Sequence, residues 1–370
     1  MNKLNPANER IKREYFAYLK EARRASEATV DAAAKAIARF EEYTRHKDFK
    51  RFHIQQATAF KAHLAEAPGV RSGQPLAKAT LFQTLKALRA FFTWLAGQPG
   101  YRSKIAYADA EYFNLSEKDV RVAMASLERP VPTLEQIEHV LRVMPEVTDI
   151  ELRDRAVIAF ALLTGARDDA IASAKLKHVD LTERRFRQDA REVRTKFSKT
   201  FDTWFFPVGG EALAILTKWI EHLREKHLWG EDDPLFPATR VEVDPTTNRF
   251  RAIGFERKTW SNAGPIREIF KKAFEGAGLP YFNPHSFRKT IARLGERLCS
   301  TPEEFKAWSQ NLGHDHVMTT LTSYGNVQTH RQAEILRDLG KPKAKRDALA
   351  DDLAALLSAH GVIAPVSPSA

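Results

Sequence analysis

Apolar residues recur at helical spacing through most of the first hundred positions. The stripes predict helices that begin near Ile11, Ser26, Ile54 and Ala77. Ser26 is a suitable N-cap for the second helix, and the last stripe stops at the breakers of residues 97–100. The pattern therefore predicts a helical domain over residues 1–100, with its lysines and arginines on the outer faces.

Residues 101–132 mix aromatic and charged residues without a long period, which predicts a linker between two domains. Phe113 and Leu115 within it could pack on either domain. Thr133 and Gln136 then form a capping box that opens the next helix. We expect a second domain over residues 133–340 and a C-terminal tail over residues 341–370, with a possible short helix at 347–359.

The second domain alternates helical stripes with a stretch of short strands. Residues 178–181, 192–196 and 204–208 predict strands joined by polar turns, and residues 240–260 predict an exposed irregular loop. Helices are predicted at about 134–143, 150–163, 211–227, 264–276, 286–298 and 302–311. The expected fold class is α+β, mostly helical, with one small antiparallel sheet.

Composition adds a reason to look for a polyanionic partner. The chain has 370 residues, 43% of them hydrophobic, and a formal charge of +11. Residues 1–100 hold 18 basic and 9 acidic residues, whereas the other 270 residues are nearly balanced. A basic segment beside a neutral remainder is typical of a module that grips nucleic acid, and a solvated surface is the ordinary alternative.

Two absences in the sequence restrict the classes of protein further. Cys299 is the only cysteine, so an intramolecular disulfide and a cysteine-rich zinc motif are both excluded. The longest apolar run falls far short of the roughly 20 residues that span a bilayer. We therefore expect a soluble, intracellular protein.

The candidate chemistry gathers between residues 285 and 324. His285 and Arg288 are three residues apart and share one face of a helix. His314 follows in Asn-Leu-Gly-His, and Tyr324 in Thr-Ser-Tyr-Gly. Asp315 and His316 follow His314, but no further set of ligands with metal spacing accompanies them, so the metal interpretation is weak. Two imidazoles, a guanidinium and a phenol suit attack on a phosphodiester.

Residues outside this stretch can complete such a site. Arg167 follows an apolar helix and the turn residue Gly165, and two guanidiniums can fork onto the non-bridging oxygens of one phosphate. Lys196 and Lys199 lie at or near the turn of the predicted hairpin, where a lysine could protonate a leaving oxygen. Taken singly, each residue has an ordinary explanation as a surface cation, a structural histidine or a core tyrosine.

The order of these motifs resembles the tyrosine recombinase (phage integrase) family. The resemblance rests on Thr-Gly-Ala-Arg167, a hairpin lysine, His285-Ser-Phe-Arg288, Leu-Gly-His314 and Tyr324, and it covers most of the chain. It implies a SAM-like core-binding domain at the N-terminus and a catalytic domain after it. Ala170 stands where many members have an acidic residue, and Phe197 and Phe201 stand where small or basic residues are common.

The resemblance also implies a role for each matching residue. Arg167 and Arg288 would clamp the scissile phosphate, and His285 and His314 would hydrogen-bond it and assist proton transfer. Lys196, which matches the family lysine better than Lys199, would protonate the leaving 5′ oxygen. Tyr324, from its own active site or a neighbour's, would attack phosphorus and form a 3′-phosphotyrosyl link, with no metal or cofactor required.

The implied function is that of a site-specific DNA recombinase. The implied partners are double-stranded recombination sites, a homo-tetramer assembled on paired sites, and accessory DNA-bending proteins, with the tail helix docked on a neighbouring protomer. The implied location is the cytoplasm of a bacterium, in association with the nucleoid. A type IB topoisomerase-like enzyme and a non-catalytic DNA-binding protein on the same fold are the alternatives.

Overall fold

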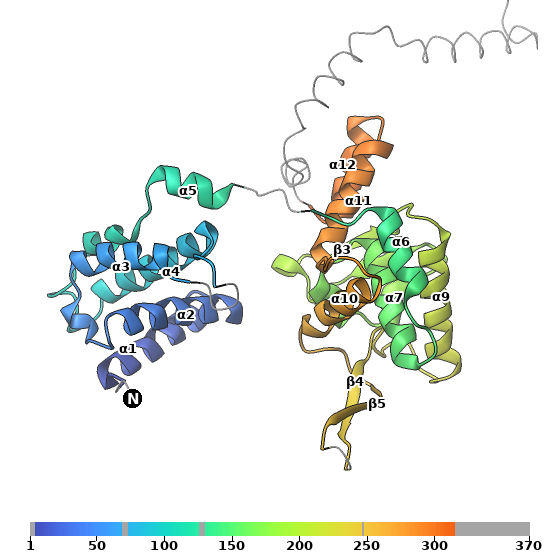
Figure 1. Cartoon of the computed structure of the whole chain (residues 1–370), viewed down its shortest axis with the longest axis horizontal. Helices are drawn as coiled ribbons and strands as arrows, with labels where there is room; N and C mark the ends of the chain where they lie inside the picture. The colour runs from blue at the N-terminus through green and yellow to red at the C-terminus, as the bar shows by residue number, and fades with distance from the viewer. Residues whose placement is uncertain (1–3, 69–72, 126–129, 246–247, 315–370) are drawn as a thin grey trace, which may run out of the picture. The chain divides into compact units, whose positions relative to one another are not determined.

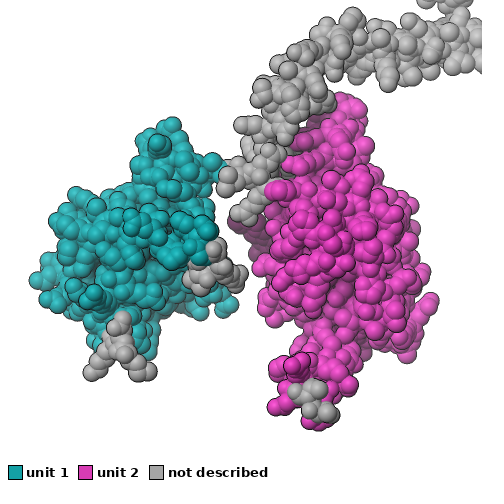
Figure 2. Space-filling view, in the orientation of Figure 1, with its two compact units in different colours: residues 1–126 teal, residues 127–370 magenta. Residues whose placement is uncertain are grey.

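The computed structural model describes residues 4–68, 73–125, 130–245 and 248–314. The chain forms two compact units, residues 1–126 and 127–370, which Figure 2 distinguishes by colour. Tyr324 and the predicted tail helix lie outside the described residues. Among the described helices, none combines the length and the apolar character that a membrane span requires.

Unit 1 is built from helices that match those predicted for residues 1–100 (Figure 1). The side chains of Asn5 and Ser26 accept hydrogen bonds from backbone N–H groups at the starts of the first two helices. The helices are α1 (Pro6–Ala17, extended by a π-helical turn over Tyr18–Ala22), α2 (Glu27–Tyr43), α3 (Ile54–Glu66) and α4 (Lys78–Ala96).

The core of unit 1 is aromatic and includes part of the predicted linker. Phe92 of α4 packs against Phe40, Phe52 and Phe113, with ring centroids 5.3, 4.2 and 5.2 Å away. Phe113 ends a 3₁₀ helix, η3 (Tyr107–Phe113), which precedes α5 (Glu117–Met124). Such pairs contribute about 0.5–1.5 kcal/mol each beyond the area they bury. Phe113 therefore belongs to the core of unit 1.

Unit 2 is organised around α7 (Asp149–Thr164), whose residues from Ala156 onward are all buried. A helix that is apolar on all sides must lie inside the fold. The capping box predicted for Thr133 is confirmed, as are the predicted helices, and a further capping box at Thr301 opens the last of them. These are α6 (Leu134–Val143), α9 (Gly210–Glu225), α10 (Gly264–Gly276), α11 (Pro284–Leu298) and α12 (Pro302–Asn311), with a short α8 (Asp168–Ser173) after α7.

The predicted small antiparallel sheet is present, although two of its three predicted strands are wrong. The strand predicted at 204–208 lies instead at residues 201–204. The order of the sheet is β1 (Val179–Asp180), β2 (Arg185–Gln188), β3 (Phe201–Trp204), preceded by a 3₁₀ turn, η4 (Leu176–His178). Residues 192–196 form no strand, because the chain between β2 and β3 is a loop whose two ends are joined by a hydrogen bond. Thr200 Oγ1 accepts a hydrogen bond from the N–H of Ala190 at 3.0 Å.

The loop predicted at residues 240–260 is also wrong. This segment forms a second antiparallel pair, β4 (Ala238–Val243) and β5 (Phe250–Glu256), which projects from the body of unit 2 (Figure 1). Val241, Val243 and Phe250 are exposed. Because backbone pairing holds this hairpin, and not burial of one face, its side chains carry no clear alternating pattern.

Candidate active site

The site is assembled where α7 ends. Gly165 closes the helix in the left-handed conformation, with φ 56°. A Cβ at this position would lie 2.9 Å from Leu312 Cδ2 and 3.1 Å from Ile291 Cδ1. A glycine is therefore required both by the turn and by the close approach of α11 and of the loop after α12. Arg167, two residues later, is half-buried and is the N-cap residue of α8.

Arg288 of α11 connects three segments of this region. Its guanidinium is buried and donates to the carbonyl oxygen of Gly165 and, at 2.5 Å, to that of Leu312. It also lies 3.2 Å from Nε2 of His314. A buried charge needs such partners, because leaving it unpaired costs several kcal/mol. The predicted arginine and the Leu-Gly-His motif are thus brought together.

The contact between Arg288 and His314 determines which nitrogen of the imidazole carries the proton. A guanidinium only donates hydrogen bonds, so Nε2 of His314 must accept. Burial, followed by the positive charges of Arg288 and Arg167, lowers the pKa of His314 to about 4. The ring is therefore neutral near pH 7, with its proton on Nδ1.

His285 contributes to the same electropositive region. It is the second residue of α11, whose N-cap Asn283 accepts a hydrogen bond from the N–H of Ser286 at 3.1 Å. The pKa of His285 is lowered by partial desolvation of its ring and by the charges of Arg288, Lys289 and Arg167. The residue as a whole is nevertheless exposed. Neutral imidazoles beside two guanidiniums form a site suited to an anion that exchanges protons.

A pair of contacts that the sequence did not suggest holds the Leu-Gly-His loop against the sheet. Asn311 accepts from the N–H of Trp204 at 2.8 Å and donates to its carbonyl oxygen at 2.8 Å. Gly313 has φ 71°, and a Cβ there would lie 2.6 Å from the ring of Phe201. In the Asn-Leu-Gly-His motif, Asn311 and Gly313 thus determine the position of His314. Only the three-dimensional structure reveals this role.

The two candidate lysines occupy different surroundings. Lys199 is half-buried and lines a cavity of about 890 Å³ together with His314, whose pKa its charge also lowers. Lys196 is exposed, in a short 3₁₀ turn η5 (Lys196–Ser198), with Nζ 4.8 Å from the ring of Phe197. The expectation that Lys196 ends the first strand of the hairpin is wrong, because β2 ends at Gln188.

Acidic residues beside the first arginine have partners of their own. Asp168 Oδ2 accepts a hydrogen bond from Nε of Arg267 at 2.8 Å and forms an ion pair with its Nη2 at 2.8 Å. Ala170, at the position that is acidic in many members of the family, is buried in the core. In the described part of the chain, the group of side chains that could hold a metal ion is Asp149, His222 and His227, at the opposite end of α7.

Comparison with known proteins identifies the family of the chain. The phage integrase family pattern matches residues 132–331, and the N-terminal SAM-like domain of phage integrases matches residues 13–98. Tyrosine recombinase XerC of Escherichia coli O157:H7 is 25% identical over 282 residues, which cover 73% of this chain and 77% of that protein. Tyrosine recombinase XerC 2 of Ralstonia nicotianae is 28% identical over 166 residues, 45% of this chain and 43% of that protein.

Solved structures share the fold. A lambda integrase dimer bound to a COC′ core site aligns with a TM-score of 0.57 and 14% identity over 87% of this chain and 99% of that one. The recombinase XerH, bound to a palindromic difH substrate, aligns with a TM-score of 0.56 and 16% identity, covering 89% and 85%. The family match and the XerC relatives show that the chain is a site-specific recombinase of the tyrosine type. The chain belongs to the phage integrase family.

The lowered pKa of His314 makes the stability of unit 2 depend on pH. In the unfolded chain the imidazole takes up a proton near its ordinary pKa of 6.5, whereas in the folded chain it does so only at about 4. Its contribution to stability is therefore complete above pH 6.5 and is lost as the pH falls toward 4. Between pH 7.5 and 4.5, we expect wild type to lose more unfolding free energy than His314→Gln, measured by urea denaturation.

The matched control for this measurement is His139→Gln, the same substitution at an exposed histidine of unit 2. The control should follow the pH dependence of the wild type. Parallel curves for wild type and His314→Gln would show that the folded environment of His314 does not favour the neutral ring.

Proposed function

We propose that this chain cleaves and rejoins DNA strands at specific sites through a 3′-phosphotyrosyl intermediate on Tyr324. The observation that carries the proposal is the buried Arg288, which is fixed by Gly165, Leu312 and His314 within the charge field of Arg167. Fixed donors in a partly dry site stabilise charge that builds up on a phosphate in the transition state.

The arginines and the histidines have different roles at the phosphate. Arg167 and Arg288 bind the non-bridging oxygens, where negative charge increases as the fifth oxygen approaches phosphorus. His314, which lies beside Arg288, hydrogen-bonds the same phosphate. His285 is neutral near pH 7 and accepts the phenolic proton of Tyr324 as the oxygen attacks.

Two successive displacements balance all atoms and protons. The Tyr324 oxygen forms a bond to phosphorus while the bond to the 5′ oxygen breaks, and Lys196 gives that oxygen a proton. A 5′-hydroxyl of a partner strand then attacks phosphorus, its proton returns to the lysine, and Tyr324 leaves with the proton held by His285. The phosphodiester energy is conserved in the protein–DNA link, so no high-energy cofactor is consumed.

Lys196 is proposed as the acid because it is the exposed lysine of the two. A strand that arrives from solvent can reach its Nζ, whereas Lys199 is half-buried beside His314 and its Nζ lies 5.8 Å from the Phe201 ring. Lys199 instead adds positive charge to the site. The turn between them contains Phe197 and Ser198, both with positive φ, which gives it a strained conformation that bound DNA can change.

The partners follow from the family and from the charge. DNA recombination sites are the substrate, because the excess of basic residues lies in residues 1–100, which include the match to the SAM-like domain. That match also favours a recombinase over a topoisomerase-like enzyme or a non-catalytic DNA-binding protein. The proposal also includes a tetramer on paired sites and accessory DNA-bending proteins. It includes docking of the predicted 347–359 helix on a neighbouring protomer, and a cytoplasmic, nucleoid-associated location.

Trapping on a suicide substrate tests the nucleophile. A nicked site loses its 5′-hydroxyl fragment after cleavage, so the covalent complex accumulates and is seen as a band of reduced mobility on a denaturing gel. We expect the adduct with wild type and none with Tyr324→Phe, while DNA binding by the variant stays within about twofold. A persistent adduct in Tyr324→Phe, or a DNA-linked peptide from another segment, would refute the proposal.

A substrate with sulfur at the bridging 5′ position separates the two lysines. Thiolate leaves without a proton, so a variant that lacks only the general acid regains activity on this substrate. We expect Lys196→Met to cleave ordinary DNA roughly 10²–10⁴-fold more slowly than wild type and to recover on the sulfur substrate. Lys199→Met is the matched control and should show a smaller loss without selective recovery. The reverse result would assign the acid to Lys199.

A further inference from the structure

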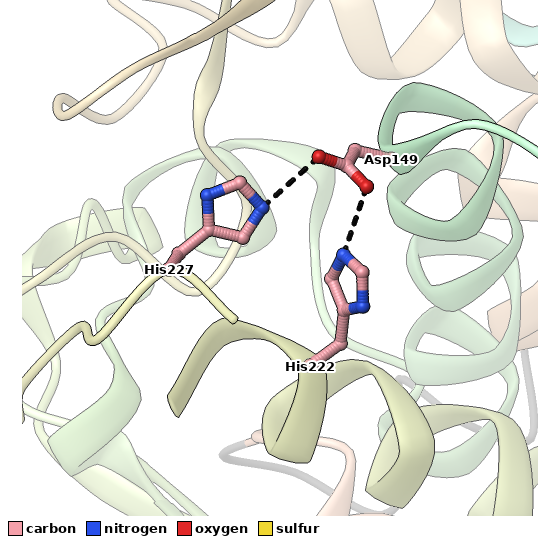
Figure 3. Close-up of side chains that lie close together, drawn as sticks. All are labelled: Asp149, His222 and His227. Atoms are coloured by element: carbon pink, nitrogen blue, oxygen red, sulfur yellow. Dashed lines mark hydrogen bonds and ion pairs between the residues drawn. The ribbon is translucent and has the colours of Figure 1, made fainter. Parts of the chain in front are cut away.

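Three metal-ligating side chains meet where α7 begins and α9 ends (Figure 3). Asp149 is the first residue of α7, His222 lies in the last turn of α9, and His227 follows that helix. Nε2 of His222 is 3.0 Å from Asp149 Oδ1, and Nε2 of His227 is 3.1 Å from Asp149 Oδ2. The three ligand atoms all lie within 4.8 Å of one another.

We propose that Asp149, His222 and His227 bind a divalent transition-metal ion of the zinc type. Imidazole nitrogens with one carboxylate suit such an ion, whereas Ca²⁺ and Mg²⁺ prefer sets made only of oxygen. Ligand bonds of about 2.0–2.2 Å place tetrahedral ligand atoms roughly 3.3 Å apart. Each histidine nitrogen moves only a few tenths of an ångström from its Asp149 oxygen, whereas the two histidine nitrogens, which lie within 4.8 Å of each other, approach by up to about 1.5 Å. Water completes the fourth position.

The surrounding residues hold the ligands in place without the ion. The Thr148 side chain caps the start of α7 and accepts from the N–H of Glu151 at 3.3 Å, which fixes the first turn that carries Asp149. The ring of His222 stacks on Trp219, with centroids 5.8 Å apart. His227 packs on Phe255 at 5.6 Å. Because the ring orientations are already set, binding an ion costs little conformational entropy.

Lys226 occupies part of the position that a cation would take. Its Nζ lies 2.8 Å from Asp149 Oδ1, and its side chain is 60% exposed. The ammonium group and a metal ion compete for the same carboxylate oxygen, and the long side chain can turn into solvent when the ion enters. Lys226 therefore weakens metal binding, so its removal should strengthen binding.

The proposed ion is separate from the chemistry of strand transfer. The 16 residues of α7 rise about 24 Å from Asp149 to Thr164, and the site around Gly165 and Arg167 begins beyond the far end. Here the metal joins the start of α7 to the end of α9 and stabilises the folded unit 2. The inference rests on the geometry of this triad and is independent of the proposed function.

The test uses the full chain without a histidine tag, stripped with EDTA and then titrated with Zn²⁺ or Co²⁺ alone. Wild type should bind Co²⁺ with visible d–d absorption bands, and a hundredfold excess of Zn²⁺ over Kd should raise the unfolding temperature by roughly 5 °C. The double variant His222→Gln/His227→Gln should lose both effects. The matched control His139→Gln, at an exposed histidine of unit 2, should keep them.

Lys226→Gln is a second, independent test of the proposed site. The side chain of Lys226 is exposed, so the substitution need not disturb folding. We expect the variant to bind Zn²⁺ severalfold more tightly than wild type in isothermal titration calorimetry. A wild type without the cobalt bands, bands retained by the histidine double variant, or an unchanged or weaker affinity in Lys226→Gln would each overturn the proposal. The catalytic histidines are intact in all of these variants, so strand cleavage on a suicide substrate distinguishes loss of this ion from loss of the active site.

Discussion

The guanidinium of Arg288 is the constraint on which the active site depends. A positive charge inside a protein is tolerated only when fixed partners surround it, and here these partners are the carbonyls of Gly165 and Leu312 and the imidazole of His314. The requirement fixes the end of α7, the middle of α11 and the loop after α12 relative to one another. The same contact leaves His314 with its proton on Nδ1, so one interaction determines both the shape and the protonation of the site.

Much of unit 2 could be predicted because its elements carry local signals. The capping residue Thr133 and the apolar stripes located the helices. The order of Arg167, Arg288 and His314 located the candidate site. Errors arose where backbone pairing, and not burial of one face, holds the strands. The β4–β5 hairpin exposes Val241 and Phe250, so no face of it shows a buried pattern.

Residues that act through distant contacts were also missed for a physical reason. Asn311 pairs with the backbone of Trp204, more than a hundred positions away, and the sequence contains no trace of that contact. Asp149 likewise meets His222 and His227 only because α7 packs against α9. The two ends of α7 therefore have different roles. The C-terminal end carries the cation-rich site, and the N-terminal end carries the proposed metal ligand Asp149, which would join α7 to α9.

The central claim is that Arg288 stabilises negative charge on the non-bridging oxygens of the scissile phosphate. The most direct measurement compares wild type and folded Arg288→Ala on two substrates, a normal phosphate and a neutral methylphosphonate at the scissile position. If the claim is right, the variant cleaves the phosphate roughly 10²–10³-fold more slowly than wild type but cleaves the methylphosphonate at a similar rate. An equal loss on both substrates would contradict it.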